Sequence, residues 1–278
     1  MSLFIHTGYA KAGSTFLQER LFAPHPGIHY LGKSRTDYPD WLIGWHYWDD
    51  FEFERQRDEL SAKLDSLCQT SRPNLISSEV FSKHGGGAAA QAHRIKAIAP
   101  AASIILVLRD PIDRLLSYYK HLVQHDGLYL PLEECLDWKR TPFVFYKRKP
   151  VYLPDYFYDE LVALYEQLFD GRVIVLRFEE LLTAPGSFCG KLGEFISVRF
   201  DVEEIAAQLE NRENASVAEG EIARLRLKNA AAGLRKLAPD YTEQPTDLAA
   251  PIGDSDLLSA AVRQRLVTYL HGRCQGYY

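Results

Sequence analysis

The sequence predicts an α/β fold in which helices flank a central parallel sheet, followed by a helical C-terminal part, as a single domain over residues 1–278. Four short apolar runs lie at residues 3–5, 74–79, 103–108 and 171–177, and helical patterns separate them. This alternation of strands and helices is typical of parallel sheets covered on both faces. A turn with glycines follows the first run, as it does where a strand and a helix together hold a phosphate.

Composition argues against several classes of function. The net charge of −5 gives no general attraction to nucleic acid or to acidic membranes, so we expect neither partner. No apolar run is long enough to span a bilayer, and a strand at the third residue leaves no room for a signal peptide. The cysteines are far apart in the sequence: Cys68, Cys135, Cys189 and Cys274. We expect them to be reduced thiols of a cytoplasmic protein, and we expect no metal site.

The turn after the first strand predicts an anion site. A nucleotide-hydrolase loop reads G-x-x-x-x-G-K-[ST]. Gly8 and Gly13 keep that spacing and Thr15 keeps the hydroxyl, but Ser14 replaces the lysine and Lys11 lies inside the loop. Glycines let backbone N–H groups approach an anion, and the start of a helix favours negative charge. We therefore expect a phosphate-type ligand other than ATP or GTP; the alternative is a generic turn with two glycines.

A second polar group follows the strand at residues 103–108. Arg109 stands at the end of that strand, Asp110 and Pro111 are typical of a helix start, and Ser117 lies nearly two turns into the helix. A guanidinium binds phosphate oxygens with two hydrogen bonds, and a hydroxyl adds one donor. Arg114 lies between them and has an ordinary structural alternative. Arg109 and Ser117 are therefore candidate ligand-binding residues.

Glu79 is a further candidate site residue. It stands at the end of the second strand, and ligands of open α/β sheets bind outside the carboxyl ends of the strands. Gly8 and Glu79 should therefore face the same crevice. The alternative is a carboxylate that caps a loop or pairs with a lysine.

The two motifs resemble those of the sulfotransferases that use 3′-phosphoadenosine 5′-phosphosulfate (PAPS). The family's first signature, G-x-x-K-x-G-[ST]-T, is complete at residues 8–15, and the second, R-x-P-x-x-R-x-x-S-x-Y, is complete at residues 109–119. The resemblance implies a P-loop NTPase-like sulfotransferase architecture of the bacterial type. It also implies transfer of a sulfuryl group from PAPS to a hydroxyl or amine, with adenosine 3′,5′-bisphosphate as the product.

The resemblance assigns roles to individual residues. The 3′-phosphate of the cofactor would be bound by Arg109 and Ser117. Lys11 and Glu79 would be catalytic, with Glu79 as the general base, and no metal is required. His46 and His84 are the next candidates for the base. The loop that would hold the 5′-phosphosulfate consists of Gly8, Tyr9, Ala10, Lys11, Ala12, Gly13, Ser14 and Thr15.

The acceptor is the least defined part of the prediction. Residues 24–53 are rich in aromatic side chains, and Trp45, His46 and Trp48 are candidates for an acceptor pocket, since sugars and apolar alcohols stack on such rings. An equally good alternative is a small core beneath a long loop. Residues 126–152 either line the acceptor entrance or form a solvated loop. We expect a small metabolite or a carbohydrate as acceptor, and the sequence predicts no oligomeric state.

Two other functions are compatible with the fold. A P-loop kinase acting on a small molecule is the main alternative, but the displaced lysine disfavours it. A binding protein without catalysis is the second, and the presence of both Lys11 and Glu79 disfavours it.

Overall fold

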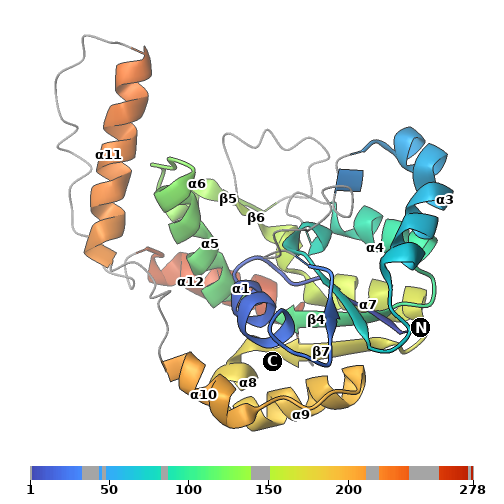
Figure 1. Cartoon of the computed structure of the whole chain (residues 1–278). Coiled ribbons are helices and arrows are strands. Elements are labelled where there is room, and N and C mark those ends of the chain that lie inside the picture. Colours follow the sequence, from blue (N-terminus) through green and yellow to red (C-terminus); the bar gives the residue numbers. More distant parts are fainter. Residues whose placement is uncertain are drawn as a thin grey trace. The chain divides into compact units, whose positions relative to one another are not determined.

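The computed structural model describes residues 2–32, 44–45, 48–82, 87–138, 151–210, 219–237, 257–274 and 277. The chain forms two compact units (Figure 1). The first contains residues 1–109, 158–212 and 277, and the second contains residues 110–157, 213–276 and 278. Each unit has a hydrophobic core of its own.

A five-stranded parallel sheet is the centre of the first unit. Its strands are β1 (Leu3–His6), β2 (His29–Tyr30), β3 (Asn74–Ser77), β4 (Ser103–Leu108) and β7 (Val173–Arg177), in the order β2-β3-β1-β4-β7. All neighbouring strands run parallel. The predicted fold class is confirmed, and β2 is an edge strand that the sequence did not predict.

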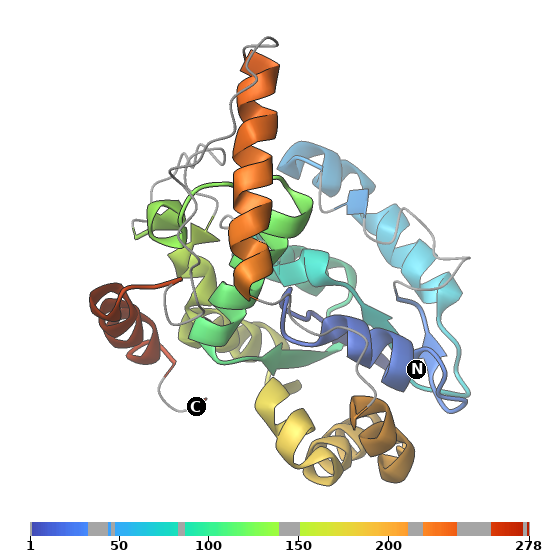
Figure 2. The same cartoon turned by 90° about the vertical axis from the view of Figure 1, so that its left-hand side faces the viewer.

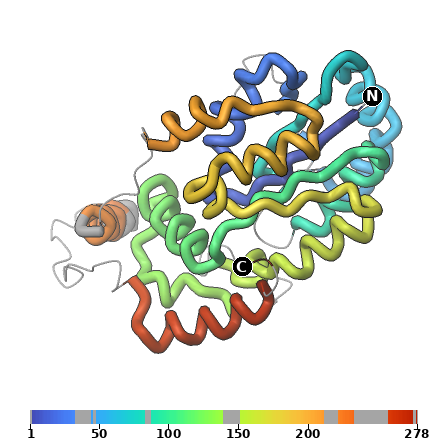
Figure 3. The backbone as a smooth tube through the Cα atoms, turned by 90° about the horizontal axis from the view of Figure 1, so that it is seen from below, coloured from blue at the N-terminus to red at the C-terminus, as the bar shows by residue number. Residues whose placement is uncertain are grey.

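Helices cover both faces of this sheet. One face packs against α1 (Ser14–Phe16), the π-helical turn η1 (Leu17–Phe22), α8 (Phe178–Thr183), α9 (Pro185–Ile196) and α10 (Val202–Glu210). Seen from below in Figure 3, α9 and α10 lie across this face. The other face carries α4 (Ala88–Ile98) and α7 (Tyr158–Phe169). The sheet is therefore the middle of three layers.

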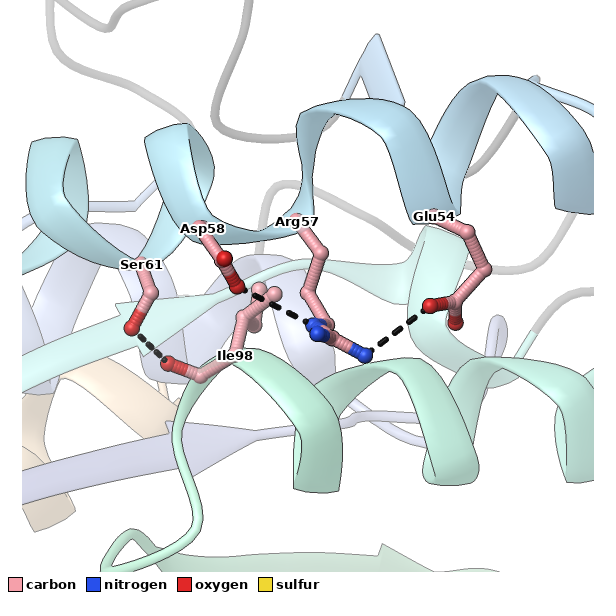
Figure 4. Close-up of polar contacts among 5 residues, drawn as sticks. All are labelled: Glu54, Arg57, Asp58, Ser61 and Ile98. Carbon is pink, nitrogen blue, oxygen red and sulfur yellow. Dashed lines mark hydrogen bonds and ion pairs between the residues drawn. The ribbon is translucent and has the colours of Figure 1, made fainter.

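The helix α3 (Asp50–Leu67) packs against α4 (Figure 4). The Ser61 hydroxyl donates to the carbonyl of Ile98 at 3.0 Å, where α4 ends. Arg57 pairs along α3 with Glu54 at 2.9 Å and with Asp58 at 3.2 Å. Helix α3 begins at Asp50 because the Asp49 carboxylate caps it by accepting the N–H of Glu52 at 2.8 Å.

The second unit is mainly helical, as predicted for the C-terminal part. It contains α5 (Pro111–His125), α6 (Leu132–Cys135), a short parallel pair formed by β5 (Leu136–Asp137) and β6 (Val151–Tyr152), η4 (Leu153–Tyr156), α11 (Glu219–Leu237) and α12 (Ala260–His271). Helix α11 lies against α5 (Figure 2). The amide of Asn229 on α11 donates to the carbonyls of Val123 and Leu128 at 2.7 and 3.0 Å, which fixes this packing.

The start of α5 follows its sequence signal closely. The Asp110 carboxylate accepts the backbone N–H groups of Ile112 and Asp113 at 2.9 and 3.0 Å, and Pro111 is the first helical residue. In the described ranges, no helix is both long enough and apolar enough to cross a membrane.

Candidate active site

The loop after β1 is a tight turn with two residues in the left-handed region. Lys11 has φ of 70° and Gly13 has φ of 81°. A left-handed lysine is uncommon and costs backbone energy, as residues at ligand sites often do. The turn is closed by hydrogen bonds from the Ala12 N–H and the Ser14 hydroxyl to the Tyr9 carbonyl, both at 3.1 Å.

Helix α1 begins directly after this turn, without a side-chain cap. The first N–H groups of a helix have no acceptor inside it, so the backbone N–H groups of Ser14 and Thr15 point out of the helix start. Together with the positive end of the helix dipole they can bind an anion. The helix continues as the π-helical turn η1, a form that is frequent at functional sites.

Gly13 is required here for a second reason, which is the ring of Phe178. A Cβ atom at position 13 would lie 2.3 Å from Cε2 of Phe178, the first residue of α8. The same ring lies beneath the Arg109 guanidinium, whose Cζ is 5.4 Å from the ring centre. Phe178 therefore supports both the loop and the arginine, and sequence reasoning missed it. The sequence feature that could have identified Phe178 is its position directly after β7, a strand of the parallel sheet.

Arg109 and the loop are in contact. The guanidinium donates to the carbonyl of Lys11 at 3.0 Å. The backbone carbonyl of Arg109 accepts the hydroxyl of Tyr158 at 2.9 Å, and the Tyr158 ring packs on Tyr9 with ring centres 5.1 Å apart. A guanidinium has five N–H donors, so this side chain can bond the loop and an anion together. The structure thus brings together the glycine loop and Arg109, two of the groups that the sequence analysis singled out.

Glu79 lies at the neighbouring strand end. It is the first residue of η3 (Glu79–Ser82), which follows β3. The Ser78 N–H donates to the His6 carbonyl at 3.2 Å, and the Ser82 hydroxyl donates to the Thr7 carbonyl, so this segment runs beside the end of β1. The Glu79 side chain is half-buried, and its carboxylate makes no hydrogen bond or ion pair with any residue in the described ranges. The alternative of a lysine partner finds no support among those residues.

The residues after Arg109 belong to the second unit. Ser117 lies half-buried on α5. Arg114 is fully buried there, donates to the Asp155 carbonyl at 3.1 Å and lies 4.3 Å above the ring of Tyr156. Its contacts match the structural alternative named for it. The share of Ser117 in binding a phosphate stays a prediction.

The aromatic stretch is only partly described. Trp45 is 1% exposed and stacks on Phe81, with ring centres 5.5 Å apart. Arg94 donates to the carbonyls of Trp45 and Trp48, each at 2.9 Å. Trp45 thus packs as a core side chain, which favours the alternative of a small core at this residue, whereas Trp48 is half-buried. His46 and His84 lie outside the described residues, and the acceptor contacts stay predictions.

Comparison with known proteins gives the family. The model of the Sulfotransferase family matches residues 3–202, well over half of the chain. A sulfotransferase from Alicyclobacillus acidocaldarius is 20% identical over 87% of this chain and 97% of its own, with a TM-score of 0.52, which shows a shared fold.

Two more distant structures align as well. Mouse sulfotransferase SULT7A1, complexed with PAP, is 16% identical over 99% of this chain and 84% of its own, with a TM-score of 0.45. The sulfotransferase domain of the Synechococcus PCC 7002 olefin synthase is 14% identical over 98% and 93%, with a TM-score of 0.42. No curated protein matches the sequence. From the family match and the shared fold, the chain belongs to the PAPS-dependent sulfotransferase family and is an enzyme that transfers sulfuryl groups.

Proposed function

We propose that this enzyme transfers the sulfuryl group of PAPS to a hydroxyl or amine of a small metabolite or carbohydrate. The observation that carries the proposal is the contact between Arg109 and the Lys11 carbonyl at 3.0 Å. This contact holds the Arg109 guanidinium beside the anion-binding loop. A ligand with two separate phosphate groups needs two such phosphate-binding groups close together. The free thiols at all four cysteines support a reducing compartment, and we propose the cytoplasm.

The residues present fit such a cofactor. Backbone N–H groups from Ala12 to Thr15 would hold the 5′-phosphosulfate at the start of α1. Arg109 would bind the 3′-phosphate through its remaining N–H groups, and the ring of Phe178 would hold its planar guanidinium in position. When bound, the cofactor supplies a sulfuryl group activated by a phosphate leaving group. Lys11 lies inside the anion-binding loop, so we assign to it the role of neutralising charge on the phosphate leaving group.

The reaction then needs two events at these side chains. As the acceptor oxygen or nitrogen bonds to sulfur, Glu79 takes its proton. The Lys11 ammonium would neutralise the charge on the phosphate oxygen that leaves sulfur with the electron pair. Most of the rate acceleration comes from positioning and electrostatics, which suits a loop closed by internal hydrogen bonds.

The first experiment measures melting temperature with saturating adenosine 3′,5′-bisphosphate and, separately, with saturating ATP–Mg. We expect the bisphosphate alone to raise it, because ligands that bind only the folded state stabilise it. Stabilisation by ATP–Mg alone would contradict the proposal and favour a P-loop kinase. With a stabilising bisphosphate, incubation with ³⁵S-labelled PAPS and a panel of sugars, alcohols and amines then identifies the acceptor class.

A further inference from the structure

A buried polar cluster lies beneath the anion-binding loop. His6, the last residue of β1, and Ser77, the last residue of β3, are both fully buried, and Gln18 on η1 is 3% exposed. The Nδ1 atom of His6 lies 2.7 Å from the Ser77 hydroxyl, and the Gln18 amide donates to the same hydroxyl at 3.0 Å. None of these side chains has a part in the binding and catalysis argued above.

The hydrogen bonds of the cluster define where the His6 ring proton sits. The Ser77 hydroxyl accepts the N–H of Gln18 and has one proton of its own to donate. Among the described groups bonded to this hydroxyl, only Nδ1 of His6 can accept that proton, because the Gln18 amide NH₂ is a donor, so we assign Ser77 as the donor to Nδ1. Burial lowers the pKa of His6 to about 3, so the ring is neutral at pH 7. Its single proton is therefore on Nε2.

That Nε2–H group is directed at the loop but lacks an acceptor. It is buried and forms no hydrogen bond with any described residue. A Cβ atom at position 8 would lie 2.7 Å from Nε2 of His6 and 2.4 Å from the Ser14 hydroxyl oxygen. The two polar atoms therefore flank the same space, which Gly8 leaves open. A buried donor without an acceptor is unfavourable, and such groups in native proteins require an explanation.

We propose that His6 is a positioning residue that prepares the Ser14 hydroxyl to bind the anion. In the present structure this hydroxyl donates to the Tyr9 carbonyl at 3.1 Å. With a phosphate group in the loop, the Ser14 side chain rotates, so that its hydroxyl donates to a phosphate oxygen and the moved oxygen accepts the Nε2–H of His6. The Tyr9 carbonyl keeps the hydrogen bond from Ala12. Each donor and acceptor of this set then has a partner. Without His6, the rotated Ser14 hydroxyl would gain the hydrogen bond to phosphate but lose the one to the Tyr9 carbonyl.

This inference rests on the proposed function, because it needs a phosphate group in the loop. The test is the affinity for adenosine 3′,5′-bisphosphate, measured by calorimetry for the wild type, His6→Phe, Ser14→Ala and the double variant. Phenylalanine keeps a ring against Phe22, whose centre lies 5.5 Å from that of His6. One hydrogen bond to a charged group corresponds to about tenfold or more in affinity, and a neutral one to about two- to tenfold.

We expect Ser14→Ala to weaken binding about tenfold or more and His6→Phe about two- to tenfold. The double variant should bind within about twofold of Ser14→Ala, because His6 acts only through the hydroxyl. Wild-type affinity in His6→Phe, or losses that multiply in the double variant, would overturn the inference and leave the proposed function intact. A wild type that does not bind the bisphosphate would overturn both.

Gln18→Met is the matched control. It removes the hydrogen bond from Gln18 to the Ser77 hydroxyl and leaves the Nε2–H of His6 in place. We expect a lower melting temperature and unchanged affinity for the bisphosphate. An affinity loss equal to that of His6→Phe would mean that the cluster only stabilises the fold, which overturns the inference.

The wild type offers a second test that does not depend on a folded His6 variant. Nitrogen-15 NMR of the His6 ring should show a proton on Nε2 in the free protein. Saturation with adenosine 3′,5′-bisphosphate should leave that tautomer unchanged and shift the Nε2–H resonance, because a new hydrogen bond forms there. Unchanged ring resonances at saturation would overturn the inference.

Discussion

The two strand ends that carry the proposed chemistry differ in how firmly they are held. At the end of β1, the loop is closed by two bonds to the Tyr9 carbonyl, by Phe178 against Gly13 and by the bond from Arg109 to Lys11. At the end of β3, the backbone around Glu79 is tied to β1. The Glu79 carboxylate itself has no hydrogen bond or ion pair within the part of the chain that the structure describes.

This difference separates binding from reaction. A loop held on several sides presents its N–H groups in one geometry, which suits one invariant ligand and limits reorganisation in the transition state. A carboxylate without fixed partners can adjust to the position of an acceptor hydroxyl or amine. We infer that changes in the loop affect both affinity and turnover, whereas a change at Glu79 affects turnover alone.

The largest expected effect is on turnover in Glu79→Gln. The amide keeps the size of the side chain and removes its basicity, and general base catalysis typically contributes about 10²–10⁴-fold. We expect turnover to fall within that range, measured as ³⁵S transfer to the identified acceptor. Glu79→Asp is the control, because it keeps a carboxylate and should retain part of the activity. Near wild-type turnover in Glu79→Gln would assign the base elsewhere, with His46 and His84 as the next candidates.

Lys11→Ala should lower turnover by about 10²–10³-fold, since it removes a charge aimed at the leaving oxygen. It should also weaken binding of adenosine 3′,5′-bisphosphate, because we propose that the side chain contacts the cofactor. Alanine retains the Cβ at this left-handed position, so the backbone strain at φ of 70° is unchanged. An affinity equal to that of the wild type would place the Lys11 ammonium away from the cofactor.

Arg109→Ala should weaken adenosine 3′,5′-bisphosphate about ten- to a hundredfold, as expected for the loss of a charge-assisted pair of about 1.5–3 kcal/mol. Adenosine 5′-phosphate lacks the 3′-phosphate and should lose much less. Calorimetry with both ligands measures the difference, and Arg109→Lys serves as the control that keeps the charge without the planar fork. Equal losses for the two ligands would mean that Arg109 does not bind the 3′-phosphate.

The smallest expected effect concerns pH and the cluster beneath the loop. His6 is neutral in the folded state, where burial lowers its pKa from 6.5 to about 3, but it takes up a proton in the unfolded state below pH 6.5. Its contribution to stability is therefore complete above pH 6.5 and is lost as the pH falls towards 3, by up to about 1.4 kcal/mol per pH unit. Urea unfolding at pH 7.5 and 5.0 should show this loss in the wild type, reduced in His6→Phe. Equal losses in both proteins would contradict the assignment to His6.

Local signals explain which parts of this molecule could be predicted. The four longer strands of the sheet and the two motifs follow from apolar runs and from residue spacing, which are properties of neighbouring positions. The edge strand His29–Tyr30 is too short for any pattern to show. The roles of Phe178 and His6 depend on contacts between distant segments: His6 meets Ser77, 71 residues away, only because β1 and β3 pair in that register.

For Trp45, the sequence left two interpretations open. Its position in an aromatic, loop-like stretch was compatible with an acceptor pocket and with a small core. Only the stacking on Phe81 and the bond from Arg94 to its carbonyl distinguish the two at this residue. Composition therefore indicated an aromatic cluster, but burial could not be read from it.

The central claim is that the end of β1 binds the cofactor and the end of β3 serves the acceptor. The most direct test is one calorimetric series with adenosine 3′,5′-bisphosphate on the wild type, Glu79→Gln and Lys11→Ala. We predict that Glu79→Gln binds within about twofold of the wild type, whereas Lys11→Ala, which loses a charge-assisted contact, binds about tenfold or more weakly. Equal loss of affinity in both variants would contradict the account, because Glu79 would then belong to the cofactor site.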